Sequence, residues 1–347
     1  MAIRFYQPGD ELKISELFQK VFHKEQSEKV WEWKYLKNPT ESNPWVLVYE
    51  EDGHILGHIS LWVHTAFVNG ETSKIASRVD TMVDPDARGK GIYKKLNQRM
   101  LMEAKKSNII YLYGFPAPKA KELLLRFTDG HYIADISRYM KILNPSKVIS
   151  SRIPFFPTVP AMDKAYLKWM LKKVEPESLN GLVMSEVDYC DEDFDQLAER
   201  LNQITPVIVK RDSDYLNWRY INHPVNNYTI LAARLNDKLV GFIVVKMEKR
   251  NLSNGRILEI GYIIDYIGES EDVLIGLGKY AMQYLKNTDM IQAWSLSNHK
   301  SDKLLKQLGF KVKDKPMPLV VHQVGENTTD YRKESDWWLL QGDVDSF

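Results

Sequence analysis

The residues that could do chemistry begin with a basic loop spaced by two glycines, Arg-Gly-Lys-Gly-Ile-Tyr-Lys at 88–94. Asp84-Pro85-Asp86 ends the apolar run before it, because proline has no N–H with which to extend a strand ladder. Glycines leave backbone N–H groups accessible, and the start of a helix adds unpaired N–H groups and a positive dipole end. The segment therefore predicts a pyrophosphate-binding loop, with a plain surface turn as the alternative interpretation.

The spacing of this loop excludes two common nucleotide-binding motifs. It matches neither G-x-x-x-x-G-K-[ST] nor G-x-G-x-x-G, so neither a P-loop triphosphatase nor a dinucleotide-binding fold is supported. The chain has a single cysteine, Cys190, and no H-E-x-x-H pair among its eight histidines. Cys190 lies in "VDYCDED", where neighbouring acids raise the thiol pKa, so we expect an inert thiol and no metal site.

The overall composition is that of a folded and nearly neutral protein. Its 347 residues exceed one ordinary hydrophobic core and predict two domains of about 150 residues each. With 47 basic and 46 acidic residues, the net charge of +1 gives no bulk attraction to nucleic acid. The N-terminal stretch lacks the apolar core of a signal peptide, and no run reaches the roughly 18 apolar residues of a membrane span. We expect a cytoplasmic protein without a transmembrane segment or a nucleic-acid partner.

The chain contains an internal repeat with an offset of 185 residues. "VWEWKYLKNP" (30–39) aligns without gaps with "YLNWRYINHP" (215–224), pairing Trp33 with Trp218 and Tyr35 with Tyr220. In each copy two β-rich runs follow, separated by the turn residues Asp52-Gly53 or Asn236-Asp237, which predicts a hairpin. The repeat indicates a duplicated domain.

The pattern of the first copy predicts an α/β (α+β) architecture with mixed central sheets flanked by helices. The second copy repeats the order between about 182 and 321. We expect domains at 1–145 and 181–347, joined by 146–180. In the first copy the expected strands are 3–6, 45–50, 54–64, 74–83, 109–114 and 131–143, and the expected helices are 10–22, 27–37, 90–106 and 118–127.

The connecting segment has two parts with different expectations. Prolines at 145, 154, 157 and 160 predict irregular structure over 144–162. The following stretch, 163–174, has Leu167, Met170, Leu171 and Val174 at helical spacing, with four lysines opposite. It predicts a basic amphipathic helix, either packed across the domain junction or lying on a membrane.

At the level of these motifs the first 145 residues resemble the GCN5-related N-acetyltransferases (GNAT). Their loop pattern [Q/R]-x-x-G-x-[G/A] is matched at Arg88 and Gly91, while Tyr93 departs from it. The "W-K-Y-x-x-N-P" segment ahead of the hairpin resembles a bacterial two-domain subgroup. The resemblance implies acetyl-CoA as cosubstrate and places its contacts on the following residues: Thr81, Met82, Val83, Arg88, Gly89, Lys90, Gly91, Ile92, Tyr93 and Lys94. Lys94, Lys95 or Arg99 could then reach the 3′-phosphate.

The second copy differs at the position of the loop. Glu269, Glu271 and Asp272 stand where the cradle would be and would repel a phosphate. The later segment "NHKSDKLLKQLGF" (298–310) keeps the family's spacing from Asn to Gly-Phe. In the first copy, by contrast, Ala117 replaces the Asn often found in the family. We therefore expect one acetyl-CoA, bound by the N-terminal domain.

The resemblance also implies direct transfer of an acetyl group to a primary amine. Asp80 is the candidate general base, the backbone N–H of Met82 the candidate oxyanion donor, and Tyr93 a candidate acid for the thiolate. The family's usual tyrosine is missing, because Leu124 or Leu125 occupies its place; Tyr111 and Tyr113 are alternatives, and His131 is interpreted as structural.

The acceptor is expected to be a small molecule or an amino sugar with a primary amine. Aromatic residues of the repeat (Trp31, Trp33, Trp218 and Tyr220) could line a cleft between domains or simply pack in the core. Two other functions remain open from the sequence. A non-catalytic acyl-CoA sensor would keep the loop without the chemistry, and a peptidoglycan-type aminoacyl transferase would also use two such domains.

Overall fold

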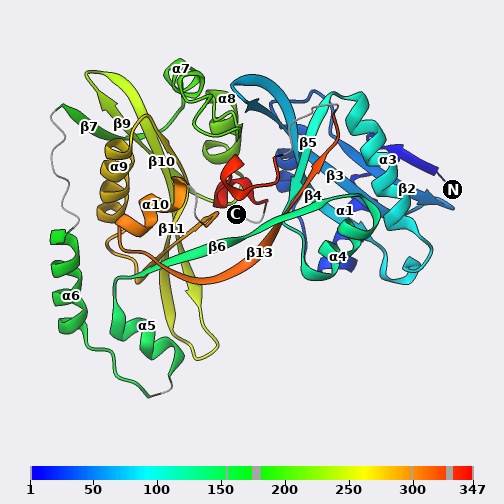
Figure 1. Ribbon diagram of the computed structural model, residues 1–347. Helices are drawn as coiled ribbons and strands as arrows, with labels where there is room; N and C mark the ends of the chain where they lie inside the picture. Colours follow the sequence, from blue (N-terminus) through cyan, green and yellow to red (C-terminus); the bar gives the residue numbers. More distant parts are fainter. Residues whose placement is uncertain (1, 154, 174–180, 298–299, 326–330, 346–347) are drawn as a thin grey trace.

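The computed structural model describes residues 2–153, 155–173, 181–297, 300–325 and 331–345. The two halves of the chain form one continuous mixed sheet with helices on its faces (Figure 1). The first half contains β1 (Ala2–Phe5), α1 (Glu11–Phe22), α2 (Glu28–Trp31), β2 (Val46–Glu51), β3 (His54–Val68), β4 (Glu71–Val83), α3 (Ile92–Lys106), β5 (Ile109–Gly114), α4 (Pro118–Phe127) and β6 (His131–Ile142).

The second half repeats this order after two connecting helices, α5 (Pro145–Arg152) and α6 (Pro160–Lys173). Its elements are β7 (Leu182–Val187), α7 (Glu192–Arg200), β8 (Val207–Val209), α8 (Ser213–Leu216), β9 (Tyr228–Leu235), β10 (Lys238–Asn251), β11 (Ile257–Gly268), α9 (Glu271–Tyr284), β12 (Met290–Ser295), α10 (Lys300–Gln307), β13 (Lys311–Gln323) and β14 (Trp337–Trp338). The α/β class predicted from the sequence is confirmed.

The last long strand of each half pairs with the other half. The order across the sheet is β1-β2-β3-β4-β5-β13-β6-β12-β11-β10-β9-β7, so β13 lies between β5 and β6, and β6 lies beside β12. Figure 1 shows β6 and β13 crossing the middle of the molecule together. The two repeats therefore share a backbone hydrogen-bond ladder at their junction.

The repeat motif itself forms the same unusual structure twice. A π-helical turn covers Glu32–Leu36 in the first half and Asn217–Ile221 in the second, at the 185-residue offset. Trp33 and Trp218 stack with ring centroids 5.4 Å apart, and the indole N–H of each donates to the backbone oxygen of the other, at 2.7 and 2.9 Å. Both rings are buried. These two tryptophans join the halves in the core, at a local two-fold relation.

The connecting segment differs from the irregular structure expected over 144–162. α5 begins at Pro145 and α6 begins at Pro160. A proline in the first turn of a helix loses no hydrogen bond, because the N–H groups there have no intrahelical acceptor. The prolines thus mark the starts of two short helices instead of preventing them. The helix expected at 163–174 starts three residues earlier, and Val174 lies outside the described residues.

Candidate active site

The candidate site lies where two neighbouring parallel strands separate. β4 pairs with β5 only from Lys74 to Ser77, opposite Ile109 to Tyr113. Beyond that point, from Arg78 to Val83, β4 keeps its pairing with β3 but no longer pairs with β5. A wedge therefore opens at the carboxyl ends of β4 and β5, the edge of an α/β sheet where ligands are commonly bound.

A β-bulge shapes the β4 side of this wedge. Val79 pairs with Ser60 and Met82 pairs with His58, so Asp80 and Thr81 together oppose a single residue of β3. Asp80 takes a left-handed backbone conformation, with φ of 44°, which is strained for a residue other than glycine. Its carbonyl oxygen lies 2.7 Å from His58 Nδ1 instead of joining the ladder.

The register also indicates which backbone N–H groups face the wedge. Asp84 donates its N–H to Leu56 O of β3 at 2.9 Å. Because N–H groups alternate in direction along a strand, Met82 directs its N–H toward β3 and Val83 directs its own toward the wedge. The wedge-facing donor nearest the bulge is thus supplied by Val83, next to the Met82 position expected from the sequence.

Asp80 forms a buried ionic cluster with the repeat motif. Lys34 Nζ lies 2.6 Å from its carboxylate, and the Tyr35 hydroxyl donates a short hydrogen bond to it. Burial alone would raise the pKa of Asp80, but the charge of Lys34 and the hydrogen bonds from Lys34 and Tyr35 together leave it lowered. Burial would lower the pKa of Lys34, and Asp80 and Asp345 leave it raised. At neutral pH the cluster is therefore a carboxylate paired with an ammonium group.

Sequence reasoning gave no role to Lys34, Tyr35 or His58. His58 is fully buried, burial lowers its pKa, and its Nε2 has no partner among the described residues. The repeat could have indicated a role for Lys34 and Tyr35. At the 185-residue offset Lys34 corresponds to Arg219, Tyr35 to Tyr220 and Asp80 to Asp265. In the second half Tyr220 likewise donates to Asp265, at 2.8 Å.

The glycine loop has the geometry of an anion cradle. Gly89 and Gly91 have φ of 89° and 75°, and a Cβ at either position would meet no atom within 4 Å. Gly91 immediately precedes α3. Among the described residues, the backbone N–H groups of Gly89, Gly91, Ile92, Tyr93 and Lys94 have no hydrogen-bond acceptor. Five donors around one turn at a helix start can hold a doubly charged pyrophosphate.

The approach to the loop is fixed by an acidic turn. Asp84 accepts from Asp86 N–H at 2.8 Å, and Lys20 of α1 pairs with both carboxylates, at 2.8 and 2.6 Å. These contacts close the turn after β4 and direct the chain toward α3. Arg88, Lys90 and Lys94 remain exposed around the glycines. Arg99 pairs with Glu103 at 2.9 Å, and Lys95 and Lys94 lie over the rings of Tyr49 and Phe127. Of these three cations Lys94 is the exposed one.

Tyr93 lies at the base of the wedge beside a buried guanidinium group. Arg78 donates to Asn97 at 2.7 Å, and Asn97 donates to Tyr93 O at 2.9 Å. Burial raises the pKa of Tyr93 and lowers that of Arg78 to about 10. Arg78 Nη2 has no partner among the described residues. Asp80 packs with the core on the α1 side of the sheet, whereas Tyr93 lies on the α3 side.

The other tyrosine candidates are packed away from the loop. Tyr111 and Tyr113 are both buried against Trp337, at ring distances of 5.8 and 6.2 Å. Their surroundings are those of core side chains. Leu124 is buried and Leu125 exposed on α4, which follows Ala117. His131 is half-buried on β6, opposite Val321.

In the described part of the chain, no three His, Cys, Asp or Glu side chains cluster as they would around a metal ion. His54 and His58 are four residues apart, but on a strand this spacing spans about 13 Å. Cys190 is fully buried, and burial, with smaller effects of Asp191 and Asp195, raises its pKa to about 12. No described helix has the length and apolarity needed to cross a bilayer.

The second half has no equivalent cradle. β11 ends at Gly268 and α9 begins at Glu271, so two residues replace the eight that join β4 to α3. Ser270 caps α9 by accepting from Val273 N–H at 3.2 Å. Glu269 pairs with Arg200 and Lys238. Of the acidic residues expected from the sequence, Glu269 thus lies in a short, closed turn, and Glu271 and Asp272 lie in the first turn of α9.

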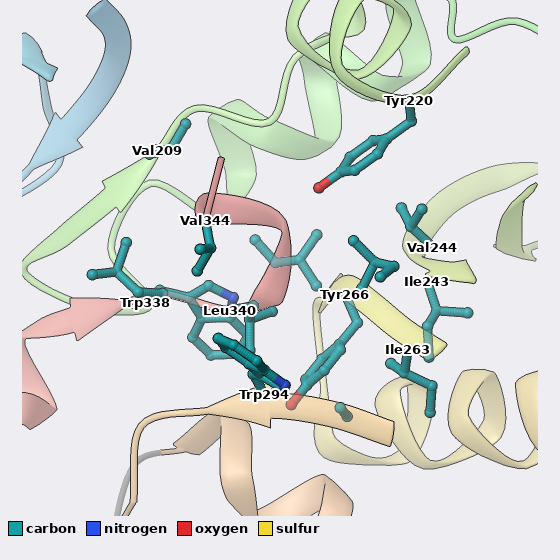
Figure 2. Close-up of a cluster of buried hydrophobic side chains, with 14 of the residues drawn as sticks. Val209, Tyr220, Ile243, Val244, Ile263, Tyr266, Trp294, Trp338, Leu340 and Val344 are labelled. Atoms are coloured by element: carbon teal, nitrogen blue, oxygen red, sulfur yellow. The ribbon is translucent and has the colours of Figure 1, made fainter. Parts of the chain in front are cut away.

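The wedge of the second half is filled by the C-terminal segment of the chain itself. Leu340 bridges to Ser295 of β12, and Figure 2 shows Trp338, Leu340 and Val344 packed among Tyr266 and Trp294. A Cβ at Gly342 would overlap Tyr220 Oη and approach Asp265, the counterpart of Asp80, within 3.4 Å. The position that corresponds to the surroundings of Asp80 is therefore occupied in the second half.

A buried salt bridge holds this segment in place. Arg211 Nε and Nη2 lie 2.9 Å from Asp265 and Asp343. Arg219 donates to the backbone oxygens of Gly342 and Val344, each at 3.1 Å. Burial raises the pKa of Asp343 to about 6, against the lowering effect of Arg211. One residue further on, Asp345 lies 3.2 Å from Lys34, so the segment connects the two repeated clusters.

A pocket of about 640 Å³ opens at the junction of the halves. Trp33 and Trp218 form part of its wall, and Glu32 and Asp214 add a carboxylate from each half. Trp33 and Trp218 thus lie in the core while also touching a cleft between the repeats.

Comparison with known proteins agrees with this geometry. Residues 2–121 match the family model of an acetyltransferase (GNAT) domain. A GCN5-related N-acetyltransferase from Anabaena variabilis superposes with a TM-score of 0.66 at 14% identity, over 93% of this chain and 72% of that one. A probable N-acyltransferase of Enterococcus faecalis gives 0.65 at 10% identity, with the same coverage. Saccharomyces cerevisiae N-myristoyltransferase with bound myristoyl-CoA gives 0.58 at 14% identity, over 97% and 88%. No curated protein matches the sequence.

Residues 2–121 therefore belong to the class of GNAT acetyltransferase domains. The fold of the chain is shared with the acyltransferase structures named above. The resemblance stated from the loop and the repeat is confirmed.

Proposed function

We propose that the protein transfers an acetyl group from acetyl-CoA to a primary amine, at a single site in its N-terminal half. The observation that carries the proposal is the coincidence of the β4–β5 wedge with the five free N–H groups of the loop at 88–94. The loop holds the pyrophosphate, and the arm of the cofactor runs between the strands with its thioester at the bulge.

The groups around the bulge supply a complete path for the transfer. The Asp80 carboxylate takes a proton from the acceptor ammonium, and the freed amine nitrogen bonds to the thioester carbon. The Val83 N–H stabilises the oxyanion that forms. The C–S bond then breaks, and Tyr93, which keeps its proton because its pKa is raised, protonates the departing thiolate. The extra proton on the new amide nitrogen passes to the Tyr93 phenolate, which leaves a neutral amide and a neutral tyrosine.

The base of the wedge supports a short acyl group. Arg78 is buried there with one guanidinium nitrogen unpartnered among the described residues. A long hydrocarbon chain against a buried cation would give it no hydrogen-bond acceptor, which is costly. An acetyl group leaves room for water at this nitrogen, so we assign acetyl in preference to the myristoyl group of the yeast structure.

The junction pocket supports an amine acceptor. Asp214 offers it a carboxylate for an amine, while Glu32 pairs with Lys37 at 3.3 Å and Lys29 also lies in the wall. The tryptophan walls offer apolar surface. Trp33 is also adjacent in sequence to Lys34, whose ammonium contacts Asp80. We therefore place the acceptor, a small amine or an amino sugar, in this pocket between the halves.

A thiol-release assay tests the proposal. Acetyl-, hexanoyl- and myristoyl-CoA are each offered with a panel of small amines and amino sugars, and release of free CoA is recorded. We expect amine-dependent release with acetyl-CoA and at least tenfold less with myristoyl-CoA. Arg78→Met should narrow this difference. Release that is absent with every amine, or fastest with myristoyl-CoA, would contradict the proposal.

A further inference from the structure

The connecting segment between the halves, residues 145–173, exposes several large apolar side chains to solvent. We call it the α5–α6 excursion. Phe155 is 99% exposed and Trp169 55% exposed, and Ile153, Val159 and Met162 are also open to solvent. Phe155 has φ of 64°, a left-handed conformation that is unfavourable for an aromatic residue. The chain thus presents an aromatic ring to water at the tip of a protruding connection.

The excursion is strongly basic within a nearly neutral protein. Residues 145–173 contain six lysines and arginines and one aspartate, in a chain of net charge +1. The single acid, Asp163, is buried and accepts from Ser146 N–H and Oγ at 2.8 and 2.6 Å. It therefore caps α5 from within and leaves the outer surface without a negative charge.

Packing accounts for only one face of α6. Met170 is buried in the main hydrophobic core and Asp163 is buried against α5, whereas Lys164, Lys168 and Trp169 are exposed. Lys164, Lys168 and Lys172 recur every four residues and form one stripe, with Met162 and Trp169 beside it. Figure 1 shows α5, α6 and their connection projecting below the second half, away from the loop before α3. The outer face thus offers lysines together with an exposed tryptophan and methionine, which are the groups that contact an anionic membrane interface.

A pocket of about 560 Å³ lies between the excursion and β11. Lys164 and Arg256 contribute cations to its wall, and Leu167 and Ile257 contribute apolar surface. Lys164 has no carboxylate within ion-pair distance among the described residues. A headgroup phosphate would find cations here, next to apolar side chains that suit the first carbons of an acyl chain.

We propose that the α5–α6 excursion docks the protein onto an anionic phospholipid surface. Phe155, Ile153 and Trp169 enter the interfacial region, and the lysine stripe lies against the headgroups. The composition of the segment favours an anionic bilayer as its partner. Such a bilayer offers negative charge to the lysines and an apolar layer to the exposed aromatic and aliphatic side chains. The proposal is independent of the acyl-transfer reaction.

Co-sedimentation with vesicles tests the proposal on the complete chain. We expect binding to vesicles of phosphatidylcholine with 30% phosphatidylglycerol, at least tenfold weaker binding to pure phosphatidylcholine, and weakening at high salt. Phe155→Ser with Trp169→Ser, and separately Lys164→Glu with Lys168→Glu, should each reduce binding at least tenfold. Matched controls are Leu12→Ser with Met102→Ser and Lys13→Glu with Lys24→Glu, which alter exposed side chains of the first half.

Three outcomes would overturn the proposal. The first is failure of the unaltered protein to sediment with anionic vesicles. The second is an equal loss of binding in the control variants, which would indicate general electrostatic attraction. The third is a dimer in sedimentation velocity that Phe155→Ser with Trp169→Ser dissociates, without any vesicle binding. That result would assign the surface to self-association.

Discussion

At the scale of single residues, Asp80 is the group on which the proposed chemistry depends. It is held ionised by Lys34 and oriented by Tyr35 in a strained bulge. We predict that Asp80→Asn lowers kcat/KM about a hundredfold, because the amide cannot accept the ammonium proton, and leaves the affinity for acetyl-CoA unchanged. Steady-state kinetics and calorimetry measure the two quantities.

The repeat offers a matched control for this variant. Asp265→Asn changes the corresponding carboxylate, which binds Arg211 and Tyr220 beneath the C-terminal segment. It should lower the melting temperature, because it breaks a buried ion pair, while the folded fraction keeps its kcat. Equal kinetic losses in both variants would deny Asp80 a role in the reaction.

Buried histidines give a second prediction at this scale. Burial, with nearby arginines, lowers the pKa of His64 and of His322 to about 3 each. The unfolded chain binds these protons at about pH 6.5 and the folded protein does not, so the free energy of unfolding falls as the pH drops below 6.5. Each histidine contributes a slope of about 1.4 kcal/mol per pH unit. Urea unfolding between pH 6.5 and 4.5 measures the slope; His64→Gln should reduce it, and the exposed His23→Asn should not.

At the scale of elements, the loop before α3 separates cofactor binding from folding. We predict that Gly91→Asp raises the KM for acetyl-CoA at least a hundredfold, because a carboxylate would take the place of the pyrophosphate at the same donors. The φ of 75° adds a strain of about 1 kcal/mol for a non-glycine residue. Gly255→Asp is the control, since Gly255 has φ of 76° and equally open surroundings. A normal KM in Gly91→Asp, or an equal rise of KM in Gly91→Asp and Gly255→Asp, would indicate that the loop is a surface turn without a role in cofactor binding.

The positions of most elements could be predicted because they depend on local patterns. Strand alternation, the glycines of the loop and the 185-residue repeat are properties of neighbouring residues, and the strands and helices of the first half lie within a few residues of the expected bounds. The expectation for the prolines at 145 and 160 was wrong, because the effect of proline depends on its position within a helix. A proline inside a helix breaks it, whereas a proline in the first turn is compatible with it.

The pairing of distant segments could not be predicted. Nothing local to 337–345 indicates that this segment fills the wedge of the second half, because its partners Arg211, Tyr220 and Asp265 are far away in sequence. The ion pair of Lys34 with Asp80 could have been predicted from the sequence, since both residues have charged counterparts at the 185-residue offset. The exchange of β6 and β13 was not, because either strand could equally have paired within its own half.

At the scale of the whole molecule, this exchange predicts that the halves do not fold separately. The ranges 1–145 and 181–347 thus describe the two copies of the repeat, and we do not expect them to be independent folding units. The fragment 1–145 would lose β13 from the edge of β5 and β12 from the edge of β6, leaving unpaired edges prone to aggregation. We expect it to be insoluble or unfolded by circular dichroism when made alone, and soluble when made together with 159–347. A stable, monomeric 1–145 fragment would contradict this.

Titration calorimetry with acetyl-CoA tests most directly whether this duplicated fold has a single cofactor site. We predict a stoichiometry of one for the unaltered chain and no measurable binding for Gly91→Asp, which should melt within a few degrees of the unaltered protein. Two equivalent sites would contradict the closure of the second wedge by residues 337–345. Unchanged binding by Gly91→Asp would contradict the assignment of the loop.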